Sequence, residues 1–136
     1  MYDDYMNPAF AGMKADSGFD RVESYPVAAD GLTAGVIVGI DANGTAVAGK
    51  GTKAIGAVLH SHTQLEPYKR GDCVSVMTRG LCWVKVADGK TVTKGEAVKF
   101  NAAGLLDNAA TDSLKNAVIR DVKDKIACIE LHAPTV

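Results

Sequence analysis

From Tyr25 onward, apolar and polar residues alternate in short runs, and turns that contain glycine separate the runs. Alternation with a period of two is typical of β-strands that bury one face. The Asn43-Gly44 pair is a strong hairpin-turn motif. The pattern predicts strands at residues 36–40, 54–62, 73–78, 81–86, 97–100 and 125–132.

One segment, residues 112–125 (DSLKNAVIRDVKDK), is compatible with two kinds of element. Ser113 could cap a helix whose apolar face holds Leu114, Val118, Ile119 and Val122. The Val-Ile pair and the alternation in the following IACIEL favour strands. We expect a strand at 116–122 and a hairpin across Lys123-Asp124, with the helix as the open alternative.

Two pairs of segments that contain glycine resemble each other. Residues 35–44 (GVIVGIDANG) resemble 95–104 (GEAVKFNAAG), and residues 70–76 (RGDCVSV) resemble 94–100 (KGEAVKF). Glycine permits the positive φ that a tight turn before a strand often needs. Hairpins that start after a glycine and repeat one pattern predict an all-β fold, either a small β-barrel or a sandwich.

The stretch 71–86 holds two of the three cysteines and the only tryptophan. We interpret Arg79-Gly80 as the two-residue turn of a hairpin. One face then carries Val74, Val76, Leu81 and Trp83, and the other face is apolar as well. We therefore assign these four residues to the core or to a self-association contact. In this register Cys73 and Cys82 are too far apart for a disulfide, so we expect all three cysteines to be reduced and mostly shielded.

Residues 1–25 show neither the 3.6-residue period of a helix nor the two-residue period of a strand. Their large apolar side chains are separated by Asp, Asn, Gly and Pro. We interpret them as an extended N-terminal arm that precedes a single β-domain at 26–136. The alternative is an N-terminal strand that covers the core. Ordering each residue costs about 1–2 kcal/mol, and burying a large apolar side chain returns about 1.5–3 kcal/mol. The arm should therefore become ordered only where a partner adds backbone hydrogen bonds. The candidate contact residues are Tyr2, Tyr5, Met6, Phe10, Met13 and Phe19.

Composition narrows the classes of partner. The 136-residue chain has a formal net charge of −1, and its Lys and Arg residues are scattered, so we expect no nucleic-acid partner. The most apolar run is far shorter than the roughly 20 residues that span a bilayer, and the start lacks a secretory signal. We expect a protein made in the cytoplasm with no membrane partner. An odd number of cysteines fits reduced thiols.

Two exposed motifs invite a functional interpretation that their context does not favour. Arg70-Gly71-Asp72 is the triplet of adhesive ligands, but Lys94-Gly95-Glu96 occupies the equivalent position, which favours a turn. Lys90 lies in a hairpin turn like the modified lysine of carrier domains, without the flanking residues of those domains.

A zinc site is the remaining chemical possibility. His60 and His62 lie on one face of a predicted strand and could bind zinc together with His132 or Cys128. No further ligand pattern accompanies them, and we find no motif for nucleophilic or acid–base catalysis. We therefore predict no metal, no cofactor and no enzymatic activity.

The order and spacing of these segments resemble the small capsid cement, or decoration, proteins of tailed bacteriophages. The matching segments are residues 11–41, 54–62 (AIGAVLHSH), 68–86 (YKRGDCVSVMTRGLCWVKV) and 91–104 (TVTKGEAVKFNAAG). The resemblance implies an all-β virion protein on the outer surface of an icosahedral head. It also implies that the major capsid protein is the partner, that the protein ties capsid subunits together, and that no cofactor is involved.

Self-association is a further expectation. The two-sided apolar hairpin and the resemblance together predict a homotrimer at local three-fold positions, with a dimer on two-fold axes as the alternative. The competing hypothesis for function is a receptor- or carbohydrate-binding β-module of a phage tail or fibre. That hypothesis predicts aromatic residues on exposed loops, and the loops DANG, ADGK and NAAG have none, which favours the cement protein.

Overall fold

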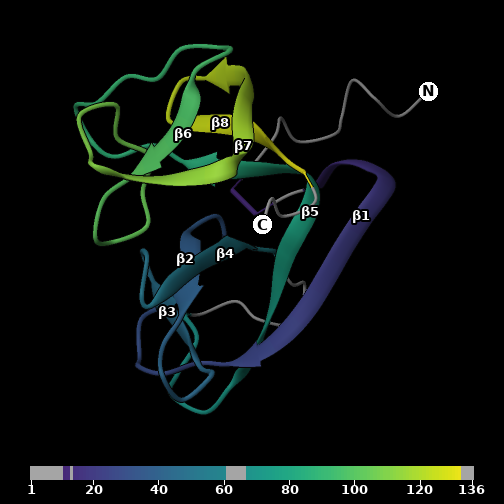
Figure 1. The fold of residues 1–136 in the computed structure, drawn as a ribbon, viewed down its shortest axis with the longest axis vertical. Coiled ribbons are helices and arrows are strands. Elements are labelled where there is room, and N and C mark those ends of the chain that lie inside the picture. Colours follow the sequence, from purple (N-terminus) through teal and green to yellow (C-terminus); the bar gives the residue numbers. More distant parts are fainter. Residues whose placement is uncertain (1–10, 13, 61–66, 133–136) are drawn as a thin grey trace.

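The computed structural model describes residues 11–12, 14–60 and 67–132, with residues 14–20 described by their backbone alone. This part of the chain forms eight β-strands and no helix (Figure 1). An all-β fold is confirmed, and none of the described residues belongs to a helix that could span a membrane. The strands are β1 (Lys14–Pro26), β2 (Ile37–Ile40), β3 (Ala46–Ala48), β4 (Lys53–Val58), β5 (Cys73–Lys85), β6 (Ala97–Phe100), β7 (Asp112–Lys123) and β8 (Ile126–Leu131).

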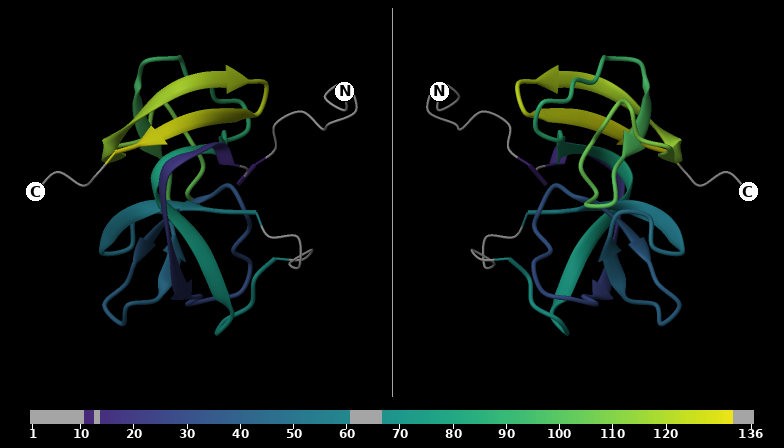
Figure 2. Two further views of the ribbon diagram at one scale, coloured as in Figure 1. Left: turned by 90° about the vertical axis from the view of Figure 1, so that its right-hand side faces the viewer. Right: turned by 90° about the vertical axis from the view of Figure 1, so that its left-hand side faces the viewer.

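All eight strands belong to one antiparallel sheet. Hydrogen-bonded neighbours follow the order β3-β2-β4-β5-β8-β7-β6, and β1 pairs with β5 from outside this path. The path ends at β3 and β6, so the sheet is not closed and the predicted barrel is wrong. Figures 1 and 2 show β2–β4 at one end of the molecule and β6–β8 at the other, with β5 running between the two ends.

The predicted hairpin at Arg79-Gly80 is also wrong, because residues 73–85 form the single strand β5. β5 pairs with β1 along one edge and with β4 and then β8 along the other. A central strand buried on both faces has two apolar faces, which is the pattern we had interpreted as two strands. A glycine inside such a strand marks an irregularity as often as a turn.

The irregularity is a β-bulge at Thr78. Arg21 and Val22 of β1 pair with Arg79 and Met77 of β5, so Thr78 is an extra residue on β5. A bulge changes which face the following side chains point to. Val74 and Val76 of β5 belong to one core and Met77 to another. Because Thr78 is an extra residue, Cys82 and Val84 after the bulge belong to the same core as Met77.

The two cores share β2, β4 and β5. β3 adds a residue to the first core, and β6, β7 and β8 add residues to the second. The first core contains Val27, Leu32, Val36, Val38, Ala46, Val58, Tyr68, Val74 and Val76. The second core contains Ile37, Ala57, Leu59, Met77, Cys82, Val84, Val86, Val98, Phe100, Leu106, Leu114, Ile119, Ala127, Ile129 and Leu131. Neither core has its own set of strands, so the two ends of the molecule depend on β5 jointly.

The ambiguous segment is a strand, as we expected. β7 spans Asp112–Lys123 and pairs with β8 across a turn at Asp124-Lys125. The turn therefore lies one residue later than we predicted. Asp124 adopts a φ of 45°, a left-handed conformation that Asp tolerates better than most residues.

The segments that resemble each other in sequence have the same turn geometry. The Gly44 N–H donates to the Asp41 carbonyl, and the Gly104 N–H donates to the Asn101 carbonyl, each at 3.0 Å. The Asp41 and Asn101 side chains each accept hydrogen bonds from the backbone N–H groups two and four residues later. The two glycines have φ values of 79° and 80°.

The second of these turns joins the two ends of the molecule. The Ile37 N–H donates to the Gly104 carbonyl at 2.8 Å, and the Gly49 N–H donates to the Ile37 carbonyl at 2.8 Å. A Cβ atom on Gly104 would lie 2.2 Å from the Ile37 oxygen, so only glycine fits there. The Lys85 N–H adds a further backbone hydrogen bond of 2.8 Å, to Gly35.

Candidate functional site

The residues predicted to contact the capsid lie mostly outside the described part of the chain. Tyr2, Tyr5, Met6, Phe10 and Met13 are among the residues that the structure does not describe. Phe19 lies in β1, where the backbone alone is described. Residues 14–25, assigned to the arm from the sequence, form part of a strand that pairs with β5 from Lys14 to Pro26. The alternative of an N-terminal strand therefore describes this stretch, and the arm stays a prediction for residues 1–10.

The four residues assigned to the core or to self-association lie on β5. Val74, Val76 and Trp83 are buried within the single chain, and Leu81 is half-buried. The two-sided apolar hairpin on which the trimer prediction rested is a central strand covered by β1, β4 and β8. Self-association stays a prediction that this hairpin no longer supports.

The thiols are only partly as expected. All three cysteines are free; Cys82 and Cys128 are buried, and Cys73 is exposed, so the expected shielding of Cys73 is wrong. Cys73 is the first residue of β5, where the sheet ends. Burial raises the pKa of the Cys82 thiol to about 12 and that of Cys128 to about 11. These two thiols therefore stay protonated and chemically inert at neutral pH.

The motifs considered for chemistry lie in turns. The Lys69 N–H donates to the Asp72 carboxylate at 2.9 Å, and the Arg70 N–H donates to Asp30 at 2.8 Å, so the Arg-Gly-Asp triplet belongs to a hydrogen-bonded turn. Within residues 11–12, 14–60 and 67–132, no group of three or more His, Cys, Asp or Glu residues could hold a metal ion. His62 lies outside the described residues.

β1 and β5 are the two longest strands, with 13 residues each, and they pair with each other; we call this pair the β1–β5 ribbon (Figure 1). Three donors from the ribbon converge on the Glu23 carboxylate. The Tyr25 hydroxyl donates to one oxygen at 2.7 Å, and the Thr78 hydroxyl donates to the other at 3.1 Å. Arg21 Nε donates to the same oxygen as Thr78, at 3.3 Å.

This cluster keeps Glu23 ionised. The hydrogen bond from Tyr25 is the largest cause that lowers the pKa of Glu23 below its ordinary value of 4.5. Burial and the same hydrogen bond raise the pKa of Tyr25 above 10.0. A carboxylate held ionised by three donors is a poor proton acceptor at neutral pH. The cluster therefore presents fixed charges at the edge of the sheet and has no arrangement for acid–base catalysis.

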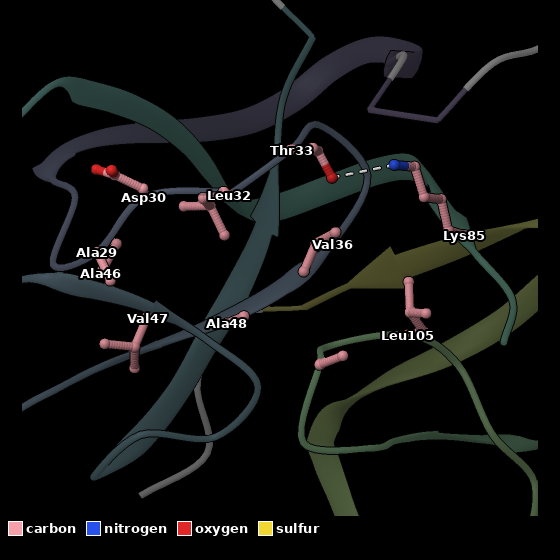
Figure 3. A pocket seen from close by; sticks show the side chains of 12 residues that line it. Ala29, Asp30, Leu32, Thr33, Val36, Ala46, Val47, Ala48, Lys85 and Leu105 are labelled. Atoms are coloured by element: carbon pink, nitrogen blue, oxygen red, sulfur yellow. Dashed lines mark hydrogen bonds between the residues drawn. The ribbon is translucent and has the colours of Figure 1, made fainter. Parts of the chain in front are cut away.

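A hollow of about 420 Å³ is lined by residues 29–33, by β3 and by the second of the two similar turns (Figure 3). At one side of the hollow, Lys85 Nζ donates a hydrogen bond of 3.0 Å to the Thr33 hydroxyl. The remaining lining is mostly small and apolar: Ala29, Leu32, Val36, Ala46, Val47, Ala48, Ala103 and Leu105, with Asp30 and Gly31. Such a lining offers van der Waals contact to an apolar side chain and few polar groups to orient a substrate.

The charged cluster on β1 was not predicted from the sequence. Arg21, Glu23 and Tyr25 alternate with Val22 and Ser24, which is the period of a strand. Polar and charged side chains at this spacing are also typical of an ordinary solvated strand face. The donor that completes the cluster, Thr78, comes from β5 and is 55 residues away in sequence from Glu23.

Comparison with known proteins gives a family and a shared fold. The chain matches the family described as "Structural cement protein (E217 gp24/Pam3 gp6)" over residues 1–132. A solved structure titled "The capsid of Myoviridae Phage XM1" contains a chain with a TM-score of 0.75 and 18% sequence identity. The alignment covers 90% of this chain and 89% of that chain. No curated protein sequence matches.

The family match extends through all eight strands and through the N-terminal residues that precede them. It confirms the resemblance found in the sequence, and the shared fold agrees with it. The chain belongs to the structural cement protein family of phage capsids.

Proposed function

We propose that this capsid cement protein binds the outer surface of a phage head and stabilises contacts between major capsid protein subunits, without a catalytic step. The observation that carries the proposal is the family match over residues 1–132. The architecture supports it, because a cement protein must contact two capsid subunits at once and resist their relative movement.

The described residues form a body suited to that task. The β2–β4 end and the β6–β8 end lie on either side of the middle of β5 (Figure 2). Backbone hydrogen bonds from Ile37 to Gly104 and from Lys85 to Gly35 connect the ends directly. Each such bond contributes about 0.5–1.5 kcal/mol net, so the two ends resist being pulled apart.

We further propose that residues 1–10 are the clamp to a neighbouring capsid subunit. The family match begins at residue 1, so this segment is part of what the family shares. Ten extended residues reach at most about 33–36 Å, and β1, which begins at Lys14, anchors the chain just after their C-terminal end. Burying the four large apolar side chains Tyr2, Tyr5, Met6 and Phe10 returns about 6–12 kcal/mol, whereas ordering the segment costs about 10–20 kcal/mol. Backbone hydrogen bonds to the capsid must therefore contribute, as in strand addition.

The test compares two truncated proteins for retention on bare phage heads by pelleting. Deletion of residues 1–10 removes the proposed clamp, and deletion of residues 133–136, which lie beyond the family match, is the control. We expect the first deletion to reduce retention at least about tenfold, which corresponds to about 1.4 kcal/mol, and the control to bind like the intact chain.

The control for folding is the circular dichroism spectrum, which should stay dominated by strand in both truncated proteins. Equal retention of the two proteins would place the capsid contact on the β-domain and refute the clamp. Binding of the intact chain to purified tails in preference to heads would favour the receptor-binding alternative.

A further inference from the structure

The outer edge of β1 is the longest strand edge without a partner strand in the described part of the chain. β1 spans 13 residues, and the one strand that pairs with it is β5. An edge strand presents N–H and C=O groups that can pair with another strand. From Val22 to Pro26 the register with β5 is unbroken, so this stretch of the edge is regular.

The outer edge strand β1 also carries an exposed apolar side chain at a position where a polar side chain would be usual. Val22 is the one exposed large hydrophobic residue among the described side chains, with 40% of its surface accessible. Arg21 and Glu23 flank it, and their side chains are 72% and 36% exposed. An apolar residue between opposite charges is a self-complementary pattern for a strand that pairs with its own copy.

From this pattern we propose that two copies of the protein associate through the outer edges of β1, paired antiparallel about Val22. Two identical edges are related by a two-fold axis. Because outward-pointing backbone groups alternate along a strand, the axis passes through one residue and its copy. We compare the three registers centred on the charged part of this edge, at Arg21, Val22 and Glu23.

Charge selects among these three registers. With Val22 at the centre, Arg21 of each copy lies opposite Glu23 of the other, and the two exposed Val22 side chains cover each other. With Arg21 or Glu23 at the centre, two like charges lie directly opposite. Opposite charges across a pair contribute about 0.2–1 kcal/mol, and like charges are destabilising. The hydrogen bonds from Tyr25 and Thr78 hold the Glu23 carboxylate in place for the contact.

The register can be tested by crosslinking. In a Cys73→Ser background, which removes the exposed native thiol, Val22→Cys places the two introduced thiols opposite each other across the axis. Cα atoms of directly opposite residues lie about 4.5–5.5 Å apart, which is within disulfide range. The matched control is Ser24→Cys, also exposed, whose two copies would lie four positions apart, or roughly 13 Å.

We expect mild oxidation to give a disulfide-linked dimer with Val22→Cys in at least about tenfold excess over Ser24→Cys, in free protein or on assembled heads. Arg21→Glu should weaken the dimer in sedimentation, because it places like charges opposite each other. Three outcomes would each overturn the proposal. The two variants could crosslink equally, or neither could crosslink in free protein or on assembled heads. The introduced thiol could also form its disulfide with another capsid chain. The crosslink does not depend on the clamp, so the two proposals fail separately.

Discussion

The backbone contact between the Asn101–Gly104 turn and β2 should contribute strongly to stability, and two glycines provide a matched test. Gly44 and Gly104 occupy the same position in turns with the same hydrogen bonds and nearly the same φ. Around a Cβ on Gly44 nothing lies within 4 Å, whereas a Cβ on Gly104 would lie 2.2 Å from the Ile37 oxygen. The perturbation is Gly104→Ala, with Gly44→Ala as the control.

The expected magnitudes follow from these contacts. Left-handed backbone strain costs both variants about 1–2 kcal/mol, and the lower entropy of the unfolded chain offsets about 0.4–1 kcal/mol. At Gly104 the turn must also move back by about 1 Å, which stretches the 2.8 Å hydrogen bond from Ile37 beyond bonding range. A buried backbone group left unpaired costs about 1–3 kcal/mol. Gly104→Ala should therefore lower the free energy of unfolding by about 2–4 kcal/mol, and Gly44→Ala by about 1 kcal/mol or less.

Urea unfolding monitored by Trp83 fluorescence measures both changes, and thermal unfolding provides a second readout. The difference between the variants should appear as a Tm that is lower by roughly 5–10 °C for Gly104→Ala. The m-values should stay equal, which would show that the unfolded states are comparable. An equal loss of stability in the two variants would refute the reasoning, because it would mean that strain alone accounts for both and that the contact to Ile37 adds nothing.

Two further predictions concern ionisation. Burial raises the pKa of Cys82 to about 12 and that of Cys128 to about 11. As the pH rises, these thiols therefore ionise in the unfolded chain before they ionise in the folded protein. The free energy of unfolding should be unaffected below about pH 9 and should fall as the pH rises above it. Urea unfolding at pH 8 and pH 10 should show a loss of up to about 1.4 kcal/mol per thiol, and a Cys82→Ala variant with the same loss as the native chain would contradict this. The pKa of Glu23 is lowered, so its contribution to the free energy of unfolding is present above pH 4.5 and is lost as the pH falls. An NMR titration of the Glu23 carboxyl should give a midpoint below 4.5, and this midpoint should rise in Tyr25→Phe. An unchanged midpoint in that variant would show that the hydrogen bond is not the cause.

Local patterns predicted the strands well, and the long-range pairing less well. β2, β6 and β8 lie within the predicted ranges. β6 alternates exposed and buried residues, whereas β2 and β8 are short, mostly buried apolar runs that lie close to turns. β5 was divided in two because a central strand with partners on both edges is apolar on both faces, and Gly80 then looks like a turn. The pairing that would correct this cannot be read from nearby residues, because the partner residues in β8 lie 41 to 51 positions further along the chain, from Lys85–Ile126 to Gly80–Leu131.

The candidate site was harder to predict than the fold. A capsid cement protein recognises its partner through surface shape and charge, so no residue type at a fixed spacing marks the contact, as it does for a metal centre or a catalytic dyad. The family could be recognised because the resemblance rested on the order and spacing of strands that follow a glycine, which can be read from the sequence directly. The cluster of Arg21, Glu23 and Tyr25 required the structure, since the Thr78 donor comes from a strand distant in sequence.

The repeated geometry explains why one sheet serves two cores. Val27 bridges to Ala46 as Val86 bridges to Leu106, both in parallel orientation. The N–H that follows each of these valines donates to the carbonyl of the bridged residue, at 3.0 and 2.8 Å. Each end is thus a version of one unit too small to bury a core alone, and β5 completes both. A cement protein gains from this arrangement, because force applied at one end is carried through the backbone of β5 to the other.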